Sequence, residues 1–114
     1  MPVGSDYSVI INGHQTINHI ERDFAFRTGG VKRNNPGVLF ISSFGNSLTH
    51  DQPVKINGVP IGHLNLIRRQ GWQTQALVIP GGVLKTDNVL ELECTADDES
   101  FMVSDTICFF NQNF

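Results

Sequence analysis

Apolar and polar side chains alternate along much of this chain, and turn-forming residues interrupt the alternation at short intervals. The clearest case lies between residues 89 and 94, where Leu90 and Leu92 take one parity and Glu91 and Glu93 take the other. A period of two is typical of a strand with one buried face and one solvated face. This segment is therefore predicted to be a half-buried β-strand.

An Asn-Gly pair predicts the most specific local feature, a β-hairpin over residues 54–66. An apolar segment runs into Asn57-Gly58, and apolar residues follow at near-alternate positions. Asn-Gly favours the left-handed backbone that a type I′ turn requires at both of its central positions. The similar pair Asn12-Gly13 also follows an apolar segment and predicts a second tight turn.

The segment that ends at Phe24 fits two structures. Ile17, Ile20 and Phe24 are spaced as on one face of a helix. Phe24 and Phe26 alternate as in a strand, and the segment is short for a helix. We therefore expect a strand over residues 23–27 and irregular structure before it.

The C-terminal segment predicts one long closing strand. Phe101, Val103, Ile107 and Phe109 share one parity, and Asp105 is the odd polar member of the series. We expect the four apolar side chains to lie on one face of this strand.

The predicted strands number about eight, and no long amphipathic helix separates them. A continuous apolar segment at 38–41 predicts a strand that is covered on both sides or lies at the sandwich centre, and a strand over 72–79 ends at the breaker 80–82. Short strands separated by turn signals predict an all-β protein, an antiparallel β-sandwich. At 114 residues, the chain is expected to form a single domain over residues 1–114.

The charge balance argues against several classes of partner. Eight Lys and Arg residues face eleven Asp and Glu residues, giving a net charge of -3, and the basic residues are scattered. Nucleic-acid binding needs clustered positive charge, so no nucleic-acid partner is expected. The chain has no apolar segment long enough for a membrane span and no signal-peptide pattern at its start. Its localisation stays open between the cytoplasm, export by a non-signal route, and a place within a larger protein.

From Val38 onward, the order of elements resembles the galactose-binding-like jelly roll. The resemblance implies a jelly roll of about eight strands and a role as a carbohydrate-binding module, a lectin or an accessory domain of a glycoside hydrolase. The segments that carry it are 38–41, 54–62, Trp72, 79–80, 84–92, Asp97-Asp98 and 101–107.

Trp72, the only tryptophan, is the leading candidate for a ligand contact. Sugar rings present C–H faces that stack on aromatic rings, and their hydroxyls pair with amide and guanidinium groups. Arg68, Arg69 and Gln73 lie beside Trp72 in sequence, and His63 follows the hairpin, so these five residues are the predicted glycan site. The alternative is that Trp72 packs in the core with its N–H on a backbone carbonyl.

Asp97, Asp98 and Glu99 form the one candidate metal site, for calcium. Calcium takes several oxygen ligands, and domains of the resembled group often hold a structural calcium. The alternative is a solvated acidic turn. Cys94 and Cys108 fall in predicted strands and are expected to be buried free thiols, and the histidines lack zinc-ligand spacing.

Catalytic motifs are absent from the sequence: it has no Gly-x-Ser-x-Gly elbow and no phosphate-cradling glycine loop in a strand-to-helix context. We therefore expect no enzyme activity but a non-catalytic, lectin-like domain whose partner is a glycan. The alternative is a structural or assembly module, favoured by low charge and the aromatic C-terminal segment 109–114. A homo-oligomer fits both readings, because oligomers multiply weak sugar sites. A third reading is a hydrolase accessory domain.

Overall fold

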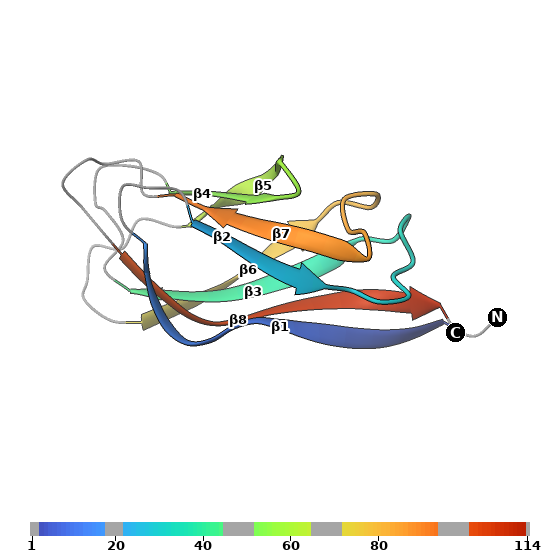
Figure 1. Cartoon of the computed structure of the whole chain (residues 1–114), viewed down its shortest axis with the longest axis horizontal. Helices are drawn as coiled ribbons and strands as arrows, with labels where there is room; N and C mark the ends of the chain where they lie inside the picture. Colours follow the sequence, from blue (N-terminus) through green and yellow to red (C-terminus); the bar gives the residue numbers. More distant parts are fainter. Residues whose placement is uncertain (1–2, 18–21, 45–51, 65–71, 94–100, 114) are drawn as a thin grey trace.

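The computed structural model describes residues 3–17, 22–44, 52–64, 72–93 and 101–113. These residues form two four-stranded sheets that face each other as two layers (Figure 1). The expected all-β antiparallel sandwich is therefore confirmed, with eight strands and no helix in the described part of the chain. The strands are β1 (Val3–Ile17), β2 (Arg22–Arg27), β3 (Gly37–Phe44), β4 (Gln52–Ile56), β5 (Val59–Leu64), β6 (Trp72–Ile79), β7 (Asp87–Leu92) and β8 (Phe101–Asn113).

The strand order is that of a jelly roll. Sheet A has the order β1-β8-β3-β6, and sheet B has the order β2-β7-β4-β5. The antiparallel pairs β1–β8, β2–β7, β3–β6 and β4–β5 are those of one long hairpin rolled into two layers. The predicted hairpin lies at the tip of this roll, and the first and last strands pair side by side.

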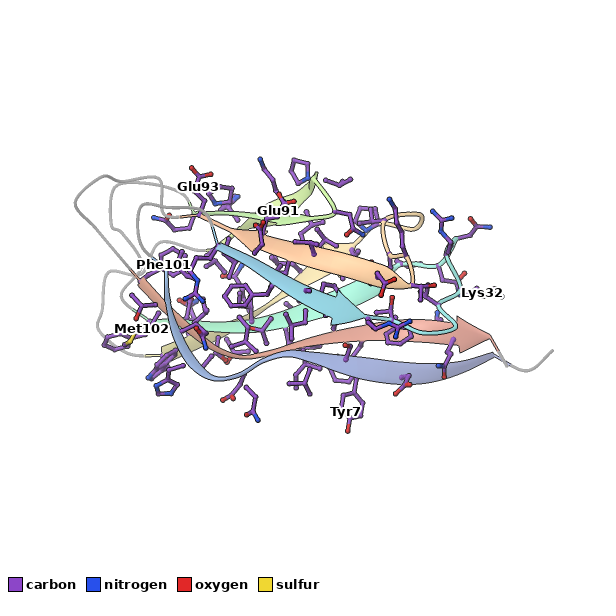
Figure 2. The ribbon with its side chains drawn as sticks, viewed as in Figure 1. Tyr7, Lys32, Glu91, Glu93, Phe101 and Met102 are labelled. Carbon is purple, nitrogen blue, oxygen red and sulfur yellow. The ribbon has the colours of Figure 1, made fainter. Side chains whose placement is uncertain are left out.

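The hydrophobic core lies between the two sheets, where every second side chain of the central strands is buried. Leu90 and Leu92 are fully buried, whereas Glu91 between them is half-buried, which confirms the alternation predicted for β7. Leu39 and Ile41 of β3 face them from sheet A and are also fully buried. Phe101 at the start of β8 lies between the layers (Figure 2).

The Asn57-Gly58 turn is confirmed, because both residues have positive φ, 54° and 79°. The turn predicted at Asn12-Gly13 is wrong, since both residues lie inside β1. Gly13 has φ of 91°, and the pairing of β1 with β8 shifts register in this region. The sequence signal for a left-handed residue was real, but it serves an irregularity within a strand instead of a chain reversal.

A second irregularity, at Asp105, changes which face the end of β8 presents. Asp105 has φ of 44°, and the register of β8 against β3 shifts there. Val103 before the shift is fully buried, whereas Phe109 after it is 42% exposed, and Cys108 is buried in its place. The prediction that Val103 and Phe109 share a face is therefore wrong, because the extra residue reverses the parity.

The thiol of Cys108 is free and buried, as expected. Burial raises the pKa of this thiol to about 12, since a thiolate would lose its hydration there. Cys94 lies outside the described residues. The described residues contain no helix that could cross a membrane.

Candidate functional site

The side of sheet A that faces away from sheet B, here called the outer face, collects the exposed apolar surface of the described residues. Tyr7 projects from this side, on the lower edge of the view (Figure 2). With the exception of Val59 in the hairpin, all large apolar side chains found exposed lie on strands of sheet A. They are Tyr7, Val9, Phe40, Trp72, Val78 and Phe109.

Trp72 lies on the outer face and not in the core. It begins β6, an edge strand, and its side chain is 44% exposed. Phe44 is its cross-strand partner on β3, with ring centroids 5.4 Å apart. The centroid of the His14 imidazole ring lies 5.0 Å from that of the Trp72 indole. These three residues form the Trp72 cluster.

His14 belongs to β1, which is the edge strand opposite to β6 in sheet A. Neighbouring strands lie about 4.8 Å apart, so the backbones of the two edge strands are about 14 Å apart across the sheet. His14 and Trp72 therefore meet by leaning over the two central strands. Ser104 and Ser42 occupy the register positions next to His14 on those two strands. Their side chains are small, so they leave space for the His14 and Trp72 rings above them.

Hydroxyl groups line the sheet beside the Trp72 cluster. Ser42 Oγ and Thr74 Oγ1 lie 2.8 Å apart, hydrogen-bonded and exposed. Ser104, their neighbour on β8, is buried beneath this surface. Aromatic faces next to accessible hydroxyls suit a ligand that has both apolar C–H surface and hydroxyl groups.

A second aromatic group lies towards the other end of the outer face. The ring of Phe109 contacts Phe40 edge-on, with centroids 5.4 Å apart, and Tyr7 at 6.1 Å. Tyr7, Phe40 and Phe109 form the Phe109 cluster. A hollow of about 200 Å³ opens beside Phe109, and it is lined by Pro36, Gly37, Val38, Phe109, Phe110 and Asn111.

The residues predicted to bind a glycan do not share one surface. Gln73 pairs with the buried Ser43, so it points to the opposite side of β6 from Trp72. His63 is exposed beside the buried Leu64 and lies on the outer side of sheet B.

Two further parts of the predicted sites lie outside the described residues. These are the arginines of the glycan site, Arg68 and Arg69, and the candidate calcium ligands, Asp97, Asp98 and Glu99. Among the described residues, no three His, Cys, Asp or Glu side chains gather closely enough to hold a metal ion. The calcium site stays a prediction.

His14 and Phe44 are the contacts of Trp72 that the sequence reading missed. For Phe44 the sequence did contain a signal. Phe40 and Phe44 alternate along β3 with the buried Leu39 and Ile41, which places both rings on the face away from the core. For His14 no local signal existed, since its contact with Trp72 depends on which strands become the two edges of sheet A.

No protein-family model and no curated protein matches the chain, so the galactose-binding-like resemblance stays a prediction. Solved structures do match. BuGH86 in complex with neoagarooctaose superposes over 97% of the chain, with a TM-score of 0.67 and 17% identity. BpGH86A, a β-porphyranase of glycoside hydrolase family 86 from the human gut bacterium Bacteroides plebeius, superposes over 95%, with a TM-score of 0.70 and 17% identity. The match spans 20% of each of those chains. This chain therefore shares its β-sandwich fold with one part of glycoside hydrolase family 86 proteins.

Proposed function

We propose that the chain is a non-catalytic carbohydrate-binding domain that holds a glycan on the outer face of sheet A. The observation that carries the proposal is the exposed indole of Trp72, flanked by His14 and Phe44 and bordered by hydroxyls. An aromatic face is electronegative, so it attracts the slightly positive C–H groups of a sugar ring. The hydroxyls of Ser42 and Thr74 can both donate and accept hydrogen bonds, as sugar hydroxyls do.

The fold comparison supports the same ligand class. One matched structure is a complex with the oligosaccharide neoagarooctaose, and another is a β-porphyranase of glycoside hydrolase family 86, so both proteins are associated with carbohydrate. This chain corresponds to a fifth of their length. An accessory domain of that size would keep a hydrolase near its polymer, in line with the role that the resemblance implies.

The non-catalytic part of the proposal rests on the sequence, which has no recognisable nucleophile motif. It is tested by incubating the protein with agarose and measuring new reducing ends. We expect none above a protein-free control, and the appearance of reducing ends would make the chain a hydrolase.

The binding proposal is tested on a glycan array that includes agar-derived oligosaccharides, with and without calcium. Trp72→Ala is expected to weaken binding of the hit by about tenfold, from the loss of a stacking contact. Val59→Ala is the matched control, because Val59 is similarly exposed, at 40%, but lies in the hairpin of sheet B. Retained affinity in Trp72→Ala would place the site elsewhere.

A second candidate function is assembly, favoured by the exposed apolar side chains of the outer face. Val9 is 51% exposed and Val78 is 64% exposed, and exposed apolar surface often marks a protein interface. Light scattering separates the two functions. A discrete oligomer that binds no glycan, and that Val78→Ser converts to a monomer, would favour assembly, whereas a monomer at all concentrations would contradict it.

A further inference from the structure

We infer that the outer face of sheet A holds an extended oligosaccharide of several linked sugars, with a second subsite at the Phe109 cluster. The inference rests on the proposed function and goes beyond it in naming the length of the ligand and a site distant from Trp72. A single sugar at Trp72 would make the Phe109 cluster irrelevant to binding. An extended ligand would need both clusters.

The spacing of the two clusters sets the length. Phe40 of one cluster and Phe44 of the other lie four residues apart on the same side of β3. At about 3.3 Å of rise per residue, the two positions are about 13 Å apart. In Figure 2, Tyr7 of the Phe109 cluster and Met102, the register partner of Phe44, lie at different positions along sheet A. One sugar ring cannot span that distance.

We expect the Phe109 cluster to hold a single sugar ring. The hollow of about 200 Å³ that Phe109 shares with neighbouring residues opens beside the cluster, and it is smaller than the roughly 300–1,000 Å³ of sites that enclose a whole drug-sized ligand. Tyr7 is 59% exposed and Phe109 is 42% exposed, so both rings keep surface available for stacking. A ligand held in so small a hollow gains affinity only by continuing along the face.

The surface between the clusters suits the middle of such a ligand. Ser42 lies midway between Phe40 and Phe44, and its hydroxyl pairs with that of Thr74. No lysine or arginine occurs among the described strand residues that point to this face. These strands therefore offer stacking and neutral hydrogen bonds along one line, which a chain of linked sugars can match and a charged partner cannot.

The test measures affinity against ligand length, using the even-numbered neoagaro-oligosaccharides from the disaccharide to the octasaccharide in titration calorimetry. We expect the octasaccharide to bind at least about tenfold more tightly than the disaccharide, since it stacks on both clusters. Tyr7→Ala should remove most of that gain and leave the disaccharide affinity unchanged. Trp72→Ala should weaken every length, and Val59→Ala should change none.

Phe109→Leu is the second variant at the distal cluster, because it keeps an apolar side chain on β8 and removes the ring. Circular dichroism checks that each variant is folded. If Tyr7→Ala and Phe109→Leu leave length dependence intact while Trp72→Ala abolishes binding, the second subsite is refuted and the proposed function stands. If the array hit lies outside this series, the same comparison is made with oligomers of that glycan; if no glycan binds, both proposals are refuted. Loss of an oligomer in Tyr7→Ala would assign the distal cluster to a second copy of the chain and refute the subsite.

Discussion

The side-chain amide of Asn57 donates a hydrogen bond to Oδ1 of Asn88 across 2.9 Å, and so ties the hairpin turn to β7. Asn88 is 2% exposed and uses its whole hydrogen-bonding capacity. Its Oδ1 also accepts from the Lys85 N–H, and its Nδ2 donates to Thr28 Oγ1 and to the Lys85 carbonyl. The end of the sandwich opposite to the Trp72 cluster is therefore held by a buried polar network.

Asn88→Ala is expected to destabilise the fold by about 2–3 kcal/mol, because it leaves buried partners without hydrogen bonds. Urea unfolding followed by circular dichroism measures the change. Asn34→Ala, at an exposed turn position, is the control and should shift the midpoint little. Equal shifts in the two variants would show that the network adds no stability.

Two substitutions of Asn57 separate the turn from the network. Asn57 has φ of 54°, and its side chain also donates to the Val83 carbonyl and accepts from the Val89 N–H. Asn57→Gly keeps the left-handed backbone accessible and loses the side-chain bonds, whereas Asn57→Ala loses both. We expect Ala to be less stable than Gly by about 1 kcal/mol in urea unfolding. Equal stability of the Gly and Ala variants would mean that the left-handed backbone at residue 57 carries no free-energy cost for alanine.

Substitutions of Asp105 test the left-handed backbone at the irregularity in β8. Its φ of 44° is tolerated by Asp but relieved by glycine. Asp105→Gly should be neutral or more stable by up to about 1 kcal/mol, and Asp105→Val should be less stable by more than that. Thermal unfolding compares the three proteins. A valine variant as stable as the wild type would contradict the left-handed conformation.

The buried thiol of Cys108 gives a pH prediction. Burial raises its pKa from 9.0 to about 12, so between these values the folded state keeps a proton that the unfolded state loses. The stabilisation is complete below pH 9 and falls as the pH rises, by at most about 1.4 kcal/mol per pH unit. The comparison uses Cys94→Ser with and without Cys108→Ala. Identical pH dependence above pH 9 in both would refute the prediction.

The single tryptophan is a direct reporter of the proposed glycan site. Trp72 is 44% exposed, so acrylamide should quench its fluorescence in the free protein. A bound oligosaccharide that stacks on the indole should reduce quenching and shift the emission to shorter wavelength. The control variant Val59→Ala should show the same change in quenching and emission as the wild-type protein. Binding that is detected by calorimetry with unchanged quenching would place the ligand away from Trp72.

The sequence predicts the features that depend on neighbouring residues. The strand over 72–79 has the bounds of β6, and the Asn57-Gly58 turn joins β4 to β5 as expected. Turn chemistry and period-two alternation are written into short segments, so they can be read without a partner strand.

What depends on strand pairing could not be predicted. The irregularity at Asp105 is visible only in the pairing of β8 with β3 and β1, and it places Phe109 on the face opposite to Val103. The contact between His14 and Trp72 likewise joins the two edges of sheet A from distant parts of the sequence. The predicted glycan site therefore included Trp72 but neither of the two rings that contact it.

The extra residue at Asp105 also decides which kinds of mutation this strand can accept. Asp105 and Thr106 together face the single residue Ile41 of β3, so deletion of Asp105 would leave the pairs Ser42–Ser104 and Phe40–Ile107 in register. Phe109 would then stay on the outer face and Cys108 in the core, and β8 would alternate regularly along its length. A residue lost from a regular part of β8 would instead turn the side chains on one side of the gap to the opposite face of the sheet. The strand therefore has one position at which its length can change without altering either face.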